Sequence, residues 1–470
     1  PPEDAPEPGG ATAAYVFESR FESGNLLHAA PYPDAEFDCA MCPDVGTGGH
    51  TQWFYFRVDG LRKGVRYRFN VTNFAKADSL YLEGMQPLVY GVGAAKSGVG
   101  WRRAGKVVCY SKNTAEAHRQ QPNAWRKEEK RRQRGRRGTH TLSFDLTLDD
   151  DEPSLYLAYS HPYTYTDLQA FLATLAADPA RSATYTRRSL CDTVAGNRCD
   201  LLTITAPPAA SAPAEAPPPR GAGDDRRRAD GDREGESRQR RLVVLSSRVH
   251  PGESNASWVM QGILDFLTSD DARAVALRRH FVFKICPMLN PDGVIQGNYR
   301  CSNSGMDLNR QWSAPSREAH PPVAALKHLI RMYQTRDAHR VALFCDLHGH
   351  SRAKGVFLYG ILSDADRYGL RARRRGWRRK LRPGDPRAFP LVLAKAAYGM
   401  FTKKKTTFRL GRGKAGTARA VVCRELGVRR SYTLEVSFMG GVAGRHRDAQ
   451  FTTRDLLDLG GQWCAALVDF

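Results

Sequence analysis

A histidine and a glutamate three residues apart form the sharpest chemical signal in the sequence. His250 and Glu253 stand in the segment HPGES, directly after the apolar stretch 241–249 and before a stretch with helical periodicity. An imidazole nitrogen and a carboxylate oxygen at this spacing can share one cation, and both suit zinc. The pair is common in isolation, but its place between a strand and a helix favours a metal site.

A catalytic zinc needs a third protein ligand and an open position for water. The segment CDLHGHS at 345–351 lies at the end of an apolar strand and offers two histidines, His348 and His350. Placement at a strand end does not choose between them. The alternative interpretation is a polar turn with solvated histidines.

The segment GNYRCSNSGMDLNRQW at 297–312 gathers several polar groups that could bind a substrate. Arg310 with the neighbouring Asn309 suits a carboxylate, because the guanidinium offers paired donors. Arg300 suits a developing oxyanion, and Asp307 lies in the same span. The alternative interpretation is that all four are ordinary surface residues with no role in binding.

Glu435 interrupts the apolar segment SYTLEVSF at 431–438. A glutamate in so apolar a strand is costly to bury without a partner. It is therefore either one half of a structural ion pair or a general base that takes a proton from the attacking water.

The segments that must position these groups alternate between strand and helix from residue 241 onward. Apolar strands separated by helices predict an α/β sheet covered on both faces, with functional groups at the carboxyl ends of the strands. The expected strands are 241–249, 280–289, 341–349, 355–360 and 431–438, and the expected helices are 257–267, 322–333, 388–401 and 453–470.

The N-terminal third of the chain has a different pattern, with short alternating runs separated by turn residues. Their β-branched and aromatic residues predict an antiparallel β-sandwich. The runs are 51–58, 65–74, 79–91, 106–111, 140–148 and 154–160.

These patterns divide the 470 residues into a flexible N-terminus 1–12, a β-sandwich domain 13–165 and an α/β domain 166–470. Residues 206–240 are rich in Pro, Ala and charge and have almost no large apolar side chain, so a disordered insertion is predicted there. A second, basic insertion is predicted at about 365–386.

The composition favours anionic partners, because 71 Lys and Arg against 49 Asp and Glu give a net charge of +22. The basic runs contain no regularly interleaved aromatic residues, which argues against nucleic acid. No apolar run reaches the roughly 18 residues of a membrane span, so no membrane partner is expected. Ten scattered cysteines and an opening without signal-peptide features predict reduced thiols in a cytosol-like compartment.

Taken in order, the segments HPGE, DLNR, DLHGHS and SYTLE resemble the motifs of the metallocarboxypeptidases, specifically of the cytosolic carboxypeptidase branch. This resemblance implies a carboxypeptidase-like mixed sheet flanked by helices and preceded by an antiparallel β-sandwich. Further segments resemble the same branch: FESGNL (21–26), QWFYFRV (52–58), GMQPLVYG (84–91), PYTYTDL (162–168), MLNPDGVIQGNYRC (288–301) and GTAR (416–419).

The resemblance implies one zinc ion per active site, held by His250, Glu253 and His348, the first histidine of its segment. Asp307 would accept a hydrogen bond from His250 and so fix its tautomer.

The resemblance also implies roles around the substrate. Asn309 and Arg310 would bind the terminal carboxylate, and Arg300 would stabilise the tetrahedral intermediate. Glu435 would deprotonate the attacking water and pass the proton to the leaving amine. Arg419, in GTAR, would face the terminal side chain and favour Glu or Asp.

The branch is known for trimming glutamates from the carboxyl-terminal tails of tubulin. The implied function is therefore a zinc metallocarboxypeptidase that removes peptide- or isopeptide-linked glutamates from acidic tails in the cytoplasm, with microtubules as a candidate partner. The alternatives are a detyrosinating carboxypeptidase, a zinc amidohydrolase of N-acyl amino acids and an inactive microtubule-binding module. Two departures from the branch are the segment preceding GTAR and the arginine-rich stretch 367–386.

Overall fold

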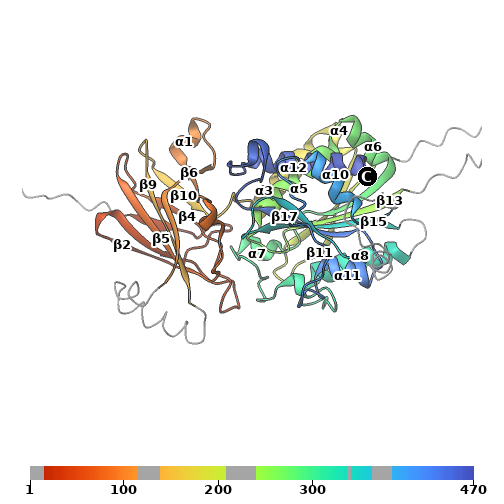
Figure 1. Cartoon of the computed structure of the whole chain (residues 1–470), viewed down its shortest axis with the longest axis horizontal. Coiled ribbons are helices and arrows are strands. Elements are labelled where there is room, and N and C mark those ends of the chain that lie inside the picture. The colour runs from red at the N-terminus through yellow and green to blue at the C-terminus, as the bar shows by residue number, and fades with distance from the viewer. Residues whose placement is uncertain (1–14, 114–137, 208–239, 336–339, 363–383) are drawn as a thin grey trace, which may run out of the picture.

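The computed structural model describes residues 15–113, 138–207, 240–335, 340–362 and 384–470. Figure 1 shows a strand-rich unit beside a unit in which helices cover a central sheet. The predicted flexible N-terminus 1–12 lies outside the described residues, as do nearly all of the insertions predicted at 206–240 and about 365–386.

The strand-rich unit consists of two five-stranded sheets, as a sandwich requires. All neighbours in the first sheet pair antiparallel. Its order is β1 (Val16–Glu18), β4 (Tyr55–Asp59), β10 (Ser154–Ala158), β6 (Leu88–Gly91) and β7 (Arg102–Arg103).

The second sheet departs from the antiparallel expectation at one pair, because β3 and β5 run parallel. Its order is β2 (His28–Tyr32), β3 (Glu36–Ala40), β5 (Arg66–Phe74), β9 (His140–Thr147) and β8 (Lys106–Lys112). Large aromatic side chains such as Phe37, Phe56 and Phe69 are completely buried between the two sheets. Their burial provides the main stabilisation of this unit.

The second unit contains a mixed seven-stranded sheet, in agreement with the predicted α/β class. Its central strands β14, β13, β15 and β17 are parallel, and the outer pairs are antiparallel. The order is β11 (Tyr185–Asp192), β12 (Arg198–Ile204), β14 (Phe281–Cys286), β13 (Arg241–Ser247), β15 (Val341–His350), β17 (Ser431–Ser437) and β16 (Val356–Tyr359).

Helices cover both faces of this sheet (Figure 1). One group packs in the larger core cluster: α3 (Tyr165–Ala177), α5 (Ser254–Thr268), α6 (Ala272–His280), α10 (Ala388–Ala396) and α12 (Thr453–Val468). The opposite face is covered by α8 (Pro321–Thr335) and α11 (Ala418–Arg424). Among the described residues, no helix combines the length and apolar character needed to cross a bilayer.

The structure corrects several predicted element boundaries. The run 79–91 is not one strand, because a 3-10 turn at Leu80–Glu83 precedes β6. The Ser79 hydroxyl caps this turn by accepting a hydrogen bond from the Tyr81 N–H, and Gly84 ends it at φ 93°. The short helices α6 and α11 were not expected from the sequence, since neither has a long apolar periodicity.

The two units are joined by buried polar contacts. Ser23 donates its hydroxyl to the Val294 carbonyl at 2.7 Å, and the Asn25 amide donates to the Gly297 carbonyl at 3.1 Å. The Asp44 carboxylate accepts from the backbone N–H groups of residues 299, 300 and 301 at 2.6–2.7 Å. The sandwich therefore fixes the loop that carries Arg300.

Candidate metal centre

A tight turn after β13 carries the first two candidate metal ligands, His250 and Glu253. Arg248 adopts a left-handed backbone conformation at φ 60°, and its side chain is almost fully buried. Its guanidinium donates to the Pro251 carbonyl at 2.7 Å and to the Tyr163 carbonyl and Ser257 hydroxyl at 2.8 Å. Burial lowers the pKa of Arg248 to about 9. This buried cation braces the turn that presents His250.

His250, Glu253 and His348 converge on one point. Nδ1 of His250 lies 2.9 Å from Glu253 Oε1, and Nδ1 of His348 lies 2.9 Å from Glu253 Oε2. The two Nδ1 atoms are 3.1 Å apart. Within the part of the chain that the structure describes, these three residues form the one cluster of buried groups placed to hold a metal ion.

His350, the other histidine of its segment, lies outside this cluster. Its Nδ1 accepts a hydrogen bond from the Arg352 N–H at 3.3 Å, and its ring packs on Phe357. Burial lowers the pKa of His350 to about 4. The geometry thus separates two histidines that the sequence left equivalent.

A carboxylate holds the far side of each imidazole in the cluster. His250 Nε2 lies 3.2 Å from Asp307 Oδ1, and His348 Nε2 lies 2.7 Å from Asp346 Oδ2. The Ser246 hydroxyl fixes Asp346 by donating to its other oxygen at 2.7 Å. Because an ionised carboxylate only accepts, each Nε2 carries the hydrogen.

The Nδ1 atoms of two such neutral imidazoles present lone pairs to each other and to Glu253. That arrangement is unfavourable until a positive charge lies between them. Burial lowers the pKa of His348, but the charges of Asp346 and Glu253 raise it well above the ordinary value, so in the metal-free protein a proton on His348 supplies that positive charge. Two imidazole nitrogens and one carboxylate are also a common donor set of catalytic zinc. The residues present therefore fit a zinc ion.

Gly349 allows Glu253 to reach the cluster. Its N–H donates to Glu253 Oε2 at 3.0 Å. A Cβ at this position would lie 2.4 Å from Asn255 Oδ1 and 2.7 Å from the Phe438 ring, so a larger residue would have to displace these neighbours of Glu253.

Asp307 connects the cluster to the cationic side of the site, which is formed by Arg300 and Arg310. Its Oδ2 accepts from Arg300 Nε at 2.8 Å, and its Oδ1 accepts from the Asn309 N–H at 3.0 Å. Burial alone would raise the pKa of Asp307, but the hydrogen bond to His250 and the charges of Arg300 and Arg310 hold it far below the ordinary value. Asp307 is therefore ionised and keeps Arg300 beside the metal ligands.

Asn309 and Arg310 lie next to the cluster in different environments. The Asn309 side chain is buried, lies 3.3 Å from His348 Nε2 and accepts from the Ala418 N–H at 2.9 Å. Arg310 is partly exposed and donates to the Asn309 carbonyl at 2.9 Å. Of the two, Arg310 has the more accessible charge for a ligand.

Glu435 lies directly beside His348, because β15 and β17 pair in parallel with these two residues in register. Burial raises the pKa of Glu435 to about 7; the charge of His348 lowers it, and that of Glu253 raises it. A carboxyl group with such a pKa can exchange protons near neutral pH.

Arg419 is buried at the start of α11, and its guanidinium lies 5.2 Å from the centre of the Tyr359 ring. Its Nε atom is buried without a hydrogen-bond partner among the described residues. Burial lowers the pKa of Arg419 to about 10, while the nearby Glu435 acts in the opposite direction. A buried guanidinium with unused donors is suited to an anionic ligand.

Sequence reasoning missed four contributors to this site: Asp346, Asp44, Arg248 and Lys414. Asp346 had a signal, because residues 346 and 348 alternate onto the same face of one strand. Asp44 had none, since its partners are more than 250 residues away. Lys414 is exposed, but part of its side chain loses hydration against its neighbours, which lowers its pKa. The charges of Arg310 and Arg300 lower the pKa of Lys414 further, so Lys414 belongs to the same group of cations.

Comparisons with known proteins identify the family to which the chain belongs. Residues 168–450 match the zinc carboxypeptidase family, and residues 17–126 match the cytosolic carboxypeptidase N-terminal domain. Cytosolic carboxypeptidase 2 of Homo sapiens is 39% identical over 457 residues, which cover 97% of this chain and 44% of that protein. Cytosolic carboxypeptidase 3 of Bos taurus is 37% identical over 97% of this chain and 40% of that protein. The chain thus spans less than half the length of these relatives.

Solved structures share the fold. A metallo-carboxypeptidase from Burkholderia cenocepacia superposes with a TM-score of 0.69 at 22% identity, over 97% of this chain and 98% of that one. A metallo-carboxypeptidase from Pseudomonas aeruginosa gives a TM-score of 0.65 at 19% identity, over 97% and 98%. With the family match across most of the α/β unit, the conclusion is that this chain belongs to the zinc carboxypeptidase family.

Proposed function

We propose that this chain is a zinc-dependent carboxypeptidase that removes glutamates, in peptide or isopeptide linkage, from acidic carboxyl-terminal tails such as those of tubulin. The observation that carries the proposal is the convergence of His250, Glu253 and His348 on one point, with Glu435 beside His348. The similarity to cytosolic carboxypeptidases supports the reaction class and a cytoplasmic location.

His250, Glu253 and His348 would hold the zinc ion, which when bound supplies Lewis-acid activation of water and of the scissile carbonyl. Glu435 takes the proton of the attacking water and delivers it to the leaving amine. Its pKa of about 7 suits both the acceptance and the release of that proton.

The cationic side of the site would bind the substrate. Arg310, together with Asn309, would donate hydrogen bonds to the terminal carboxylate, and Arg300, fixed by Asp307, would stabilise the negative charge that develops on the carbonyl oxygen. Arg419 would pair with the side-chain carboxylate of the terminal residue, which would favour Glu over Tyr. The net charge of +22 agrees with an acidic polymer as substrate.

The decisive experiment is mass spectrometry of a polyglutamylated tail peptide incubated with the zinc-loaded protein. We expect stepwise loss of glutamate with the wild type and a decrease in rate of about 10²- to 10⁴-fold with Glu435→Gln. Glu83→Gln, an exposed position on the sandwich, is the matched control and should behave as the wild type. Equal product from Glu435→Gln and wild type would remove Glu435 as the base.

The same assay tests specificity with peptides ending in Glu or Tyr. Arg419→Ala should slow release of Glu more than release of Tyr, whereas Arg279→Ala, exposed on α6, should change neither. Preferred release of Tyr by the wild type would favour the detyrosinating alternative. Hydrolysis of N-acyl aspartate without action on peptides would favour the amidohydrolase.

A further inference from the structure

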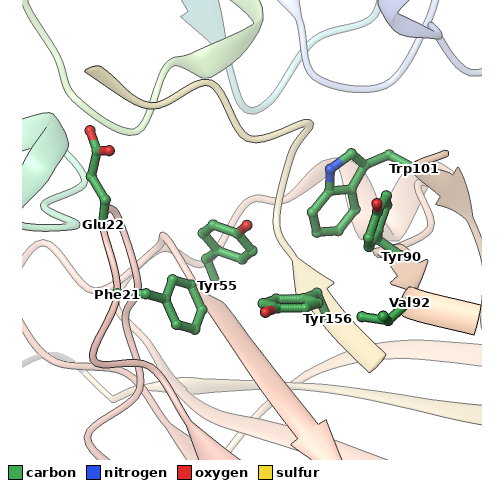
Figure 2. Close-up of a pocket in the computed structure, with 7 residues that line it drawn as sticks. All are labelled: Phe21, Glu22, Tyr55, Tyr90, Val92, Trp101 and Tyr156. Carbon is green, nitrogen blue, oxygen red and sulfur yellow. The ribbon is translucent and has the colours of Figure 1, made fainter. Parts of the chain in front are cut away.

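A cavity of about 510 Å³ lies on the sandwich, and none of its lining residues belongs to the candidate metal centre. Figure 2 shows five aromatic side chains around it, with Glu22 at one end and Val92 at the other. The aromatic residues are Phe21, Tyr55, Tyr90, Trp101 and Tyr156.

The first sheet of the sandwich builds this cavity on the face opposite the core. Tyr156 of β10 is the direct cross-strand partner of Tyr90 of β6, and Tyr55 begins β4, the other neighbour of β10. The alternate residues of these strands, such as Leu155 and Leu157, are buried in the sandwich core. Rings that would ordinarily be buried therefore stand together on an outer face.

Four of the rings form a closed circuit. The centroid distances are 5.7 Å for Tyr55–Trp101, 5.4 Å for Trp101–Tyr90, 6.2 Å for Tyr90–Tyr156 and 6.1 Å for Tyr156–Tyr55. A group at the middle of such a circuit lies within about 6 Å of all four centroids, which is the range of cation–π attraction. Phe21 closes one side at 4.9 Å from Tyr55.

Two carboxylates lie on the Glu22 side of the circuit. Glu22 lines the cavity and accepts hydrogen bonds from the N–H groups of Tyr165 and Thr166, and Asp167 lies in the same helix turn. Burial, neighbouring tyrosines and the charges of Asp167 and Glu22 all raise the pKa of the Tyr55 hydroxyl. Such a field attracts a cation.

The protein's own cations leave the rings available. Among the described residues, no lysine or arginine lies over any of the five rings. Arg57 hydrogen-bonds with the hydroxyl of Tyr156 and is paired with Asp59 at 3.0 Å, so it contacts the rim of this ring and not its face.

We propose that this aromatic cavity binds the trimethylated lysine side chain of a partner protein. An unmodified ammonium brings three N–H donors that need acceptors, and ring faces provide only weak ones. A trimethylammonium group keeps the charge and has no N–H to satisfy, so it loses less free energy on entering the cavity. The volume also accommodates the apolar stem of the side chain, which would pack on Phe21.

The test uses the 470-residue protein loaded with zinc and three peptides that differ at one side chain. Calorimetric titration compares trimethyl-lysine, unmodified lysine and an uncharged isostere in which a tert-butyl group replaces the trimethylammonium. We expect the trimethyl-lysine peptide to bind about tenfold or more tightly than the isostere, because the two share shape and differ in charge. Equal affinity for the isostere would overturn the proposal.

Two variants locate the binding. Trp101→Leu removes one ring of the circuit and should weaken binding about tenfold. Glu22→Gln removes the charge but keeps an acceptor for the Tyr165 and Thr166 N–H groups, and it should weaken binding severalfold. Tyr398→Leu, a tyrosine that is 75% exposed on another surface, is the control and should change nothing.

Other ligands provide the opposing outcomes. Binding of free choline or of phosphatidylcholine vesicles, without binding of the peptide, would assign the cavity to another source of the same cation. Binding of a proline-rich peptide in place of all three would show that the rings recognise an extended backbone. Either result would overturn the proposal, and glutamate release by the same sample would be unaffected, so the proposed function is judged separately.

Discussion

At the scale of single residues, the candidate metal centre depends on side chains that face away from the cation. Asp346 is completely buried, holds His348 Nε2 at 2.7 Å and is itself fixed by Ser246. It therefore decides which nitrogen of His348 presents a lone pair to the cluster.

Asp346→Asn tests this dependence. The amide keeps the shape of the side chain but removes the charge that orients and polarises His348, so zinc affinity should fall about 10- to 100-fold. Competition titration against a chelator measures the change independently of activity. Asp448→Asn, at an exposed position, is the control. An unchanged zinc affinity would contradict a supporting role for Asp346.

Arg248 supports a second residue-scale prediction. Arg248→Met leaves the Pro251 and Tyr163 carbonyls and the Ser257 hydroxyl without their donor, so the protein should lose about 3 kcal/mol of stability. Calorimetric unfolding of the zinc-free protein measures this loss. Arg248→Lys, which retains a donor, should lose less; equal losses would show that only side-chain volume matters.

At the scale of secondary structure, the site depends on the register of two strands and on the position of one loop. The parallel register of β15 and β17 places Glu435 beside His348, and a slip of one residue would turn Glu435 to the opposite face. The loop at 299–301 is aligned differently, by the Asp44 carboxylate from the other unit.

Asp44→Ala should reduce turnover without removing zinc. Three N–H groups lose their acceptor, which costs about 1–3 kcal/mol for each group left unsatisfied, and the loop bearing Arg300 loosens. The measurements are kcat for tail-peptide hydrolysis and bound zinc by elemental mass spectrometry. Asp44→Asn, which retains one oxygen acceptor, should be intermediate. A lower thermal midpoint with unchanged kcat would mean that the contact is structural only.

The sequence predicts where the helices and strands lie better than it predicts the contacts between residues distant along the chain. Strand and helix periodicity located β13, β15 and β17 within a few residues, because their apolar patterns are set locally. The motifs placed His250 and Glu253 together because three residues separate them. The choice of His348 over His350, by contrast, came from resemblance alone, and Asp44 and Arg248 were missed because their roles arise from contacts that periodicity does not encode.

At the scale of the whole molecule, the net charge of +22 and the cations at the site favour acidic substrates. The charge of Arg300 lowers the pKa of Arg310, both charges lower the pKa of Lys414, and Arg419 lies near Glu435. Such a concentration of positive charge raises the local concentration of an acidic tail before it is bound.

Salt should therefore act mainly on KM. Raising ionic strength from about 0.1 M to about 1 M shortens the screening length from about 10 Å to about 3 Å, so KM for a long polyglutamate tail should rise while kcat changes little. Steady-state kinetics in both conditions measure the effect. A dipeptide ending in Glu provides the comparison, and an equal rise in its KM would show that distant charges do not contribute.

The contacts that join the two units also bear on how this architecture can be inherited and redesigned. Ser23, Asn25 and Asp44 reach residues 294–301, so the sandwich supplies part of the framework of the α/β unit. A chimera that exchanges one unit alone would have to match these buried donors and acceptors at the junction. Recombinant proteins should therefore keep the two units together, and sequence changes should be better tolerated in the surface loops than at the junction.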